Sequence, residues 1–457
     1  MKKQILTFIS LFLALFLQAQ VSKTIQIDTA GTLKNKILLT EAHSLTRLTI
    51  KGTLSPVDLG YIKYNMFNLE YLDLNGVTSI VAYTGDGATA PGIQIYNANE
   101  IPMMCFRNTI DTVLVSATAI ITIDSFTGFK GIAIIDKNNS QFASSDGIVF
   151  IKDMTKIVFF PTTKTGSYSV PTNVVSIYPY AFSGAGITEL HLSSSVKTIG
   201  YYAFAGSLLQ KIYIPTSVNK FGTSVFSNCD SLKAVFEYTA NPSSIILSSS
   251  SLVYSATDTS EVLYVPIGSL ELYQKASGWK DFDHIKEFAE LTASSDSKTV
   301  SLTTMGKWSV SSNVTWLSIN TSSGNGNGTF TITSLPNNTA SERIGVITIL
   351  SDSTTALKSM KNSRTITVFQ AGNGTATFAP TISSDNFIIY PNPTSSSFTV
   401  NTDKDALVQI FTTNGMLTYS KNIFGKELIP VNELQSGVYI VRIITKDSII
   451  SKSLIVK

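Results

Sequence analysis

The chain has 457 residues, a length that usually folds as about two to four domains rather than around one core. Only 14% of the residues are charged, the net charge is +3, and the sequence has no basic cluster, so nucleic acid is excluded as an expected partner. The abundance of Ser, Thr, Asn and Gly fits β-rich extracellular modules better than charged cytosolic helices.

Residues 1–20 have the pattern of a secretory signal peptide. Lys2 and Lys3 precede an apolar run over residues 5–17 and a short polar end, with cleavage expected near Ala19 or Gln20. A membrane anchor is the alternative, but the run is too short to span a bilayer comfortably. We therefore expect export, and no N-terminal lipid anchor, because no cysteine follows closely.

Residues 21–288 contain a repeated strand pattern. Leu45, Leu48 and Ile50 are apolar at positions i, i+3 and i+5, and this spacing returns along the segment. The later sets begin at Leu69, Ile110, Phe129, Met154, Ile187, Leu209 and Leu232. Most sets lie about 20 residues apart, which is the period of a leucine-rich-type solenoid, so the pattern predicts one inward-facing strand in each coil. A single coil cannot bury its own apolar face, so the coils must stack.

The clearest repeats lie in residues 170–238, where two columns of large apolar residues recur every 22 positions. One column is Ile177, Ile199 and Phe221, and the other is Phe182, Phe204 and Phe226. Phe106 takes the place of the second column in an earlier coil. We expect these residues to form the buried core of the repeats.

The two cysteines, Cys105 and Cys229, could form a disulfide in an exported protein. Cys105 precedes Phe106 at an inward position, whereas Cys229 falls in a turn of a different coil. Two separate buried thiols are therefore the preferred interpretation.

The residues between the apolar ones should point to the opposite face of each strand. Because equivalent positions of stacked coils lie about 4.8 Å apart, His191, Tyr213 and Phe236 should form a continuous aromatic ladder. The outward positions proposed as a binding face are His191, Tyr213, Phe236, Tyr238, Lys211, Arg47 and Lys51. An ordinary solvated strand face is the alternative for each of them.

The repeat segment resembles the BspA-type leucine-rich repeat proteins of bacterial cell surfaces over about residues 40–288. The resemblance includes NEIPMMCF at residues 99–106, the Asp146-Gly147 hairpin insertion between repeats, and the closing segment that begins LYVPIGSL. It departs at Cys105 and at Val225, which stand where small residues are usual. The resemblance implies a secreted or surface interaction protein rather than an enzyme.

Residues 289–374 read as short strands separated by Gly, Asn and Ser turns, which predicts an immunoglobulin-like sandwich. Trp308, Trp316, Arg343 and Gln370 resemble the paired tryptophans, the arginine and the terminal V-x-Q of the BACON family. That resemblance implies an extracellular module for which glycan or mucin contact has been proposed. Core packing of both tryptophans is preferred over sugar stacking.

Residues 375–386 are expected to be a linker, and residues 387–457 a compact all-β tail. The tail resembles the C-terminal sorting domain of type IX secretion substrates. The residues that carry this resemblance include Tyr390, Pro391, Asn392, Pro393, Gly437, Tyr439 and Lys452. It implies passage through the outer membrane by the type IX machinery, followed by release or by attachment to outer-membrane lipopolysaccharide.

The sequence shows none of the spacings typical of catalytic or metal-binding sites. The chain has three histidines, and none lies at a metal-ligand spacing from another ligand type. Gly85-Asp86-Gly87 lacks the residues of a phosphate loop or a calcium loop, so a plain turn in a projecting loop is expected. His191 and Cys229 should lie on different sides of their coils, which argues against a cysteine hydrolase. We expect no catalytic residue, no metal and no cofactor.

Taken together, these features predict a mainly β chain in which a leucine-rich-repeat solenoid is followed by two small β-sandwich domains. The predicted function is adhesion or binding at the cell surface or after release, with the solenoid face contacting host or matrix proteins. The alternative is a glycan-binding accessory protein of polysaccharide or mucin capture that uses the region of Trp308 and Trp316.

Overall fold

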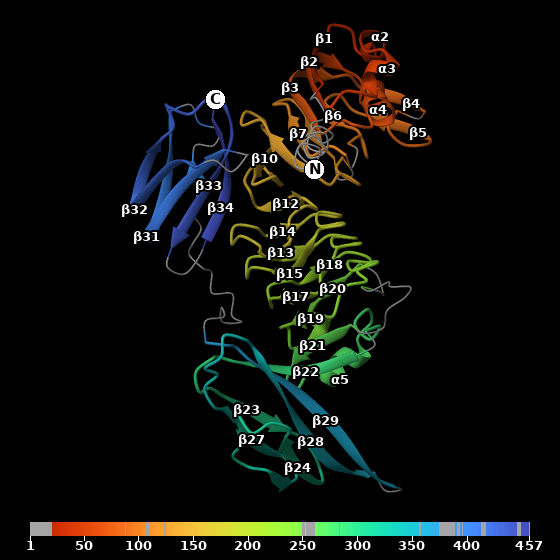
Figure 1. Ribbon diagram of the computed structural model, residues 1–457. Coiled ribbons are helices and arrows are strands. Elements are labelled where there is room, and N and C mark those ends of the chain that lie inside the picture. The colour runs from red at the N-terminus through yellow and green to blue at the C-terminus, as the bar shows by residue number, and fades with distance from the viewer. Residues whose placement is uncertain are drawn as a thin grey trace, which may run out of the picture. The chain divides into compact units, whose positions relative to one another are not determined.

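The computed structural model describes residues 21–373 and 389–456, apart from residues 87, 107–108, 123–124, 249–251, 253–260, 283, 356–357, 391–393, 395, 413–416 and 446–448. The fold is mainly β and divides into two compact units, Met1–Thr377 and Phe378–Lys457 (Figure 1). The signal peptide and the linker predicted at residues 375–386 lie outside the described residues. None of the helices described is long and apolar enough to cross a membrane.

The first unit begins with a parallel five-stranded sheet. In spatial order its strands are β1 (Ser22–Ile27), β2 (Arg47–Leu54), β3 (Tyr71–Ile80), β7 (Thr112–Val115) and β9 (Ile132–Ile135). Alternate residues face the core, as in β2, where Leu48 and Ile50 are fully buried. This period-two burial leaves the intervening side chains on the outer surface of the sheet.

Short helices and small sheets complete the N-terminal coils. They are α2 (Leu33–Lys36), α3 (Leu39–Ala42), α4 (Pro56–Asn65), the antiparallel hairpin of β4 (Tyr83–Asp86) and β5 (Ile93–Tyr96), and the parallel pair β6 (Glu100–Ile101) and β8 (Ile120–Ile121). Helix α4 starts with a capping box in which Ser55 and Asp58 satisfy each other's backbone N–H groups. The Gly85-Asp86 segment, expected in a plain turn, belongs to strand β4 of the hairpin.

Strand β9 is shifted by one residue from the predicted pattern. The repeat spacing predicts Ile132 and Ile134 as inward residues, but the structure buries Ala133 and Ile135. Gly131 explains the shift, because a Cβ there would come within 2.4 Å of backbone oxygens in the preceding coil. The turn therefore runs tightly against that coil and the strand begins later. The prediction was wrong for this strand, and Ile132 and Ile134 face outward.

A seven-stranded sheet follows the first one. Its order is β10 (Phe142–Ser145), β11 (Ile148–Ile151), β12 (Lys156–Phe159), β14 (Ser176–Ile177), β16 (Thr198–Ile199), β18 (Lys220–Phe221) and β20 (Ile246–Leu247). Strands β10 and β11 form the hairpin that contains Asp146-Gly147, with both turn residues at positive φ. The prediction that the strand around Ile157 stacks with the inward strands of the other repeats was wrong: Ile157 pairs with Ile177 in this second sheet, because the hairpin intervenes.

Each later coil turns through two residues with positive φ that flank the core phenylalanine. In the coil of Phe182 these are Tyr180 at φ 59° and Gly184 at φ 69°, and the next coil repeats them at Tyr202 and Gly206. Glycine reaches this conformation without the steric cost that a side chain adds. The phenylalanine between them points inward.

The two repeat columns are continuous and buried. Ile177, Ile199 and Phe221 are parallel neighbours in the seven-stranded sheet. The rings of Phe182, Phe204 and Phe226 follow one another at centroid distances of 5.6 Å, and none is more than 1% exposed. Phe106 is 3% exposed and packs on Phe126 and Phe129 in the N-terminal core.

A ten-stranded sheet continues from the solenoid into the sandwich (Figure 1). Its order is β13 (Gly166–Ser169), β15 (Ile187–His191), β17 (Lys211–Ile214), β19 (Ala234–Glu237), β21 (Val262–Pro266), β22 (His284–Leu291), β29 (Lys358–Gln370), β28 (Arg343–Thr355), β24 (Lys307–Ser312) and β26 (Ser323–Asn325). Pairing is parallel from β13 to β29 and antiparallel beyond. The 3-10 helix Pro242–Ser244 and α5 (Leu270–Lys275) lie in the last coils.

The second layer of the sandwich is an antiparallel sheet of β23 (Ser297–Leu302), β27 (Gly328–Ser334) and β25 (Leu317–Ile319). Inward residues of both layers, such as Phe330, Ile332 and Ile366, form its core. The domain boundary predicted at residues 288–289 falls inside β22. This strand pairs with β21 on one side and with β29 on the other, so solenoid and sandwich share it.

The second unit is a five-stranded antiparallel sheet. It contains β30 (Ile389–Tyr390), β31 (Ser397–Thr412), β32 (Leu417–Pro430), β33 (Gly437–Thr445) and β34 (Ile449–Val456). Tyr439 is 8% exposed and its hydroxyl donates to the Gln435 carbonyl at 2.9 Å, just before Gly437 opens β33. Tyr390 and Lys452 lie on β30 and β34, while Pro391, Asn392 and Pro393 lie outside the described residues.

Candidate binding face

The aromatic ladder predicted on the solenoid exists. The rings of His191 and Tyr213 stack at a centroid distance of 4.3 Å, and Tyr213 and Phe236 at 4.7 Å, with interplanar angles of 5° and 7°. Tyr264 extends the ladder at 4.8 Å from Phe236. Sequence reasoning missed Tyr264, although it stands between the inward residues of its strand and so marks an outward position.

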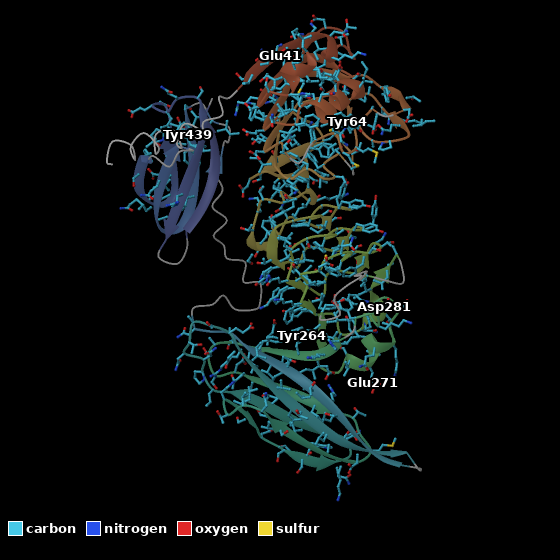
Figure 2. All side chains as sticks on the ribbon, turned by 45° about the vertical axis from the view of Figure 1, so that its right-hand side comes forward. Glu41, Tyr64, Tyr264, Glu271, Asp281 and Tyr439 are labelled. Carbon is cyan, nitrogen blue, oxygen red and sulfur yellow. The ribbon has the colours of Figure 1, made fainter. Side chains whose placement is uncertain are left out.

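Most of this ladder is covered rather than open. Tyr213 is 7% exposed and Phe236 is 3% exposed, so the expectation that they present a solvent-facing binding surface was wrong. The covering residues are Phe288 of β22 and Phe369 of β29, whose ring centroids lie 5.4 Å and 5.2 Å from that of Phe236 in edge-to-face arrangements. Contact between β19 and β29, which are not neighbours, requires the sheet to twist strongly toward itself. Figure 2 labels Tyr264 where β21 approaches the sandwich.

Charged residues surround the covered ladder. His191 Nε2 lies 2.6 Å from the Glu189 carboxylate, and this hydrogen bond lowers the pKa of Glu189. The hydroxyl of Tyr238 donates to Glu290 at 2.7 Å. Burial raises the pKa of Glu290 to about 7, and the neighbouring Glu342 carboxylate adds to the shift. Of the predicted face, His191, Lys211 and Tyr238 therefore contribute to the edge of an internal contact.

Glu342 lies in the sandwich, just before β28, and is close to charged residues of the solenoid face. Burial raises the pKa of Glu342, and the nearby Lys211 ammonium opposes that shift. Lys211 belongs to β17 of the solenoid, so charges of the two parts face each other across the ladder.

A buried ion pair fastens the two parts of the sheet. Both Nε and Nη2 of Arg364 on β29 donate to the Glu287 carboxylate of β22, the latter at 2.8 Å. The Glu287 side chain is 1% exposed and also accepts from the Gly268 N–H at 2.7 Å. The bidentate geometry and the third donor compensate much of the desolvation of the carboxylate. The sandwich is thus attached by a paired strand and a satisfied charge.

The predicted residues Arg47 and Lys51 lie elsewhere, on the outer surface of the N-terminal sheet. The Arg47 guanidinium stacks on the Tyr71 ring, with its carbon 3.8 Å from the centroid. Lys51 is exposed. Two rows of partly exposed residues, called here the open rows, cross this sheet. They are Arg47, Tyr71, Thr112 and Ile132 in one row and Thr49, Asp73, Leu114 and Ile134 in the other.

Both tryptophans of the sandwich contact other residues of the same domain. Trp308 is 5% exposed and its Nε1 donates to the Gly326 carbonyl at 3.0 Å. The Arg343 guanidinium covers the Trp316 ring at 4.3 Å and its Nε donates to Gln370 at 2.8 Å. Gln370 is fully buried and donates in turn to backbone carbonyls of the adjoining turns. These contacts favour core packing over sugar stacking, above all for Trp308.

Cys105 and Cys229 are free and buried, as the sequence predicts. Burial raises the pKa of the Cys229 thiol to about 11, and its Sγ contacts the Phe204 carbonyl oxygen at 3.0 Å. The His191 imidazole instead pairs with Glu189, so the Cys229 thiol and the His191 imidazole have different partners. Across the described residues, no group of three or more His, Cys, Asp or Glu side chains is placed to hold a metal ion.

Three families match separate parts of the chain. They are the BspA type leucine-rich repeat region over residues 152–255, the BACON putative binding domain over residues 306–371, and the secretion system C-terminal sorting domain over residues 388–457. All three modules named from the sequence are therefore present. They are binding and sorting modules.

Solved structures with detectable similarity include a leucine-rich repeat protein from Eubacterium ventriosum, which is 17% identical, covers 54% of this chain and 73% of its own, and has a TM-score of 0.33. A leucine-rich cell surface protein from Faecalibacterium prausnitzii is 14% identical over the same shares of the chains, with a TM-score of 0.30. No curated protein matches the chain.

The modules define a class of protein. The sorting domain directs the chain through type IX secretion to the cell surface or the medium, and the repeat region is of a type found in surface proteins. The chain is a secreted or cell-surface binding protein with a BspA-like solenoid, a BACON domain and a type IX sorting tail.

Proposed function

We propose that this protein is an adhesin that contacts host or matrix proteins through the open rows of its N-terminal sheet. The observation that carries the proposal is the difference in cover between the two solenoid sheets. The aromatic ladder on the ten-stranded sheet is covered by Phe369 of the sandwich, whereas the open rows of the N-terminal sheet keep partial exposure along four strands. We therefore assign partner recognition to the N-terminal sheet, whose outward side chains remain accessible.

The chemistry of the open rows suits a broad protein contact. Arg47 stacked on Tyr71 offers a cation and an aromatic ring in one fixed arrangement. Arginine and tyrosine are enriched among residues that dominate protein interfaces. Leu114, Ile132 and Ile134 add apolar area beside them. Asp73 within the rows and Lys51 next to them supply charge of both signs. Nothing in this arrangement requires catalysis, and we propose a binding role alone.

The test is a solid-phase binding assay of residues 21–457 on immobilised matrix proteins. Replacing Arg47 and Tyr71 together by Ala should weaken binding about tenfold or more, because both anchors are lost. The matched control is Lys220→Ala with Tyr201→Ala, which removes an exposed cation and a ring that is 38% exposed from another part of the solenoid. Equal binding by the two double variants would remove the open rows as the contact surface.

The alternative function, glycan capture by the region of Trp308 and Trp316, has less support. Stacking on a sugar needs an accessible ring face, but Trp308 is buried and Arg343 occupies one face of Trp316. We propose that the sandwich instead fixes the position of the solenoid. After export, we expect the sorting tail to be removed and the mature protein either to be released or to be attached to outer-membrane lipopolysaccharide.

A further inference from the structure

A separate cavity of about 220 Å³ opens between helix α4 and the hairpin of β4 and β5. It lies in the N-terminal coils and includes none of the open-row residues. Its lining comes from α2 and the turn before it, from one side of α4, and from β4 and Ala88 beyond it. The polar and aromatic side chains of this lining are those of Lys34, Asp58, Tyr61, Tyr64, Asn65, Tyr83 and Asp86.

Three tyrosine rings form the walls of this cavity. Tyr61 and Tyr64 are three positions apart on α4 and therefore share one side of the helix. The Tyr61 hydroxyl donates to the Ile37 carbonyl at 2.9 Å, and the Tyr83 hydroxyl donates to the Asp86 carbonyl at 3.1 Å. These bonds fix two of the rings. Tyr64, labelled in Figure 2, is 46% exposed. The Lys63 ammonium lies over one face of its ring at 5.5 Å from the centroid, so a ligand would pack on the other face.

The base of the cavity is rigid. Asp58 is 1% exposed, and its carboxylate accepts from the backbone N–H groups of Gly31, Leu33 and Ser55 at 2.7–2.9 Å. These bonds tie α4 to the preceding turn. Gly60 lies so near the Ala88 carbonyl that a Cβ there would be 1.8 Å from its oxygen. The cavity is thus formed before any ligand arrives, which lowers the entropic cost of binding.

The rim carries donors and acceptors that the protein itself does not use. Asn65 donates through Nδ2 to the Tyr61 carbonyl at 3.0 Å, so its side-chain oxygen faces no donor from the described residues. Within the described part of the chain, the Lys34 ammonium and the Asp86 carboxylate have neither a hydrogen bond nor an ion pair with another side chain. Together with Asp58 at the base, the lining of the cavity carries two carboxylates and one ammonium group.

We propose that this cavity binds one neutral pyranose unit of a glycan. A pyranose presents a C–H face, which packs on an aromatic ring, and a border of hydroxyls, each of which can donate and accept. Rings at the wall and mixed donors and acceptors at the rim match that combination. The volume is below the range of about 300–1,000 Å³ that takes drug-sized ligands, so a single sugar unit is the appropriate size.

The excess of carboxylates in the lining, Asp58 and Asp86 against Lys34 alone, selects against anionic sugars. Asp86 would repel a carboxylate or sulfate, and Lys34 provides only one compensating cation. Glycan binding here goes beyond the protein adhesion proposed above, because it uses different residues and a different kind of ligand.

The test is a glycan microarray of neutral, sialylated and sulfated structures, probed with residues 21–457. Binding to neutral glycans should weaken about tenfold in Tyr64→Ala, since one stacking ring is lost, and should be largely retained in Tyr64→Phe, which keeps the ring. Tyr201→Ala is the matched control, because that tyrosine is also partly exposed but lies outside the cavity. Unchanged melting of Tyr64→Ala would show that the loss is local.

Three results would overturn the proposal. They are the absence of any binding to neutral glycans, equal binding by wild type and Tyr64→Ala, and binding confined to the sialylated or sulfated glycans. None of them bears on the matrix-protein assay with Arg47 and Tyr71, so this site and the adhesive face fail or succeed separately.

Discussion

The two outward surfaces of the solenoid arise from the same repeat yet end in opposite states. On the N-terminal sheet, Tyr71 lies beside Arg47 and stays partly exposed. On the ten-stranded sheet, Phe236 of the aromatic ladder occupies a similar outward position but is 3% exposed because Phe288 and Phe369 cover it. The difference teaches that a repeat determines the direction of a side chain, whereas a neighbouring domain determines its access to solvent.

The largest expected effect comes from removing the covered ring. Phe236→Ala should lower the free energy of unfolding by about 3–5 kcal/mol, the cost of emptying a buried aromatic site. Tyr71→Ala on the open sheet should cost about 1 kcal/mol or less, because its ring remains partly solvated. Chemical denaturation followed by tryptophan fluorescence measures both. Similar small losses in the two variants would mean that the ladder is not covered in solution.

The next effect concerns the ion pair that holds the cover in place. Arg364→Ala leaves the Glu287 carboxylate buried without its cation and should cost about 3 kcal/mol, near the lower end for a broken buried pair because Arg364 is itself partly exposed. Lys275→Ala is the control, since its pair with Glu271 is largely solvent-exposed and should contribute little. If both variants unfold alike, the Glu287 pair does not stabilise the junction.

The smallest expected effect is a pH dependence at the last coils. Burial raises the pKa of Glu237 to about 8 from its ordinary value of 4.5. A carboxyl with a raised folded-state pKa contributes most below the unfolded pKa, and the contribution is lost as the pH rises toward 8. The free energy of unfolding should therefore fall steadily between pH 5 and pH 8.5.

Glu237→Gln should remove part of this slope and raise stability at pH 8.5, because the amide carries no charge to desolvate. Some slope should remain, since Glu290 shifts in the same direction. Glu271→Gln, at a largely exposed position, should leave the slope unchanged. A slope of the opposite sign in the wild type would contradict the assignment.

The sequence predicted the parts that depend on local spacing. The column of Phe182, Phe204 and Phe226 was visible because stacked coils repeat their inward positions, and the aromatic ladder followed from the same register. Ile132 was misplaced because every residue of its strand is apolar, so alternation gave no polar position to fix the register. The cover over Phe236 could not be foreseen, because Phe369 lies far along the chain and approaches only through the twist of a shared sheet.

The shared strand β22 also has a mechanical consequence. In the adhesive role proposed above, the protein would be pulled when its bound surface moves away from the cell, and tension between solenoid and sandwich would pass through the junction. Residues 287–291 of β22 pair in register with residues 366–370 of β29, and the Glu287–Arg364 pair lies at the start of that ladder. Tension would thus be distributed over parallel backbone hydrogen bonds and a buried charge pair instead of stretching a flexible peptide.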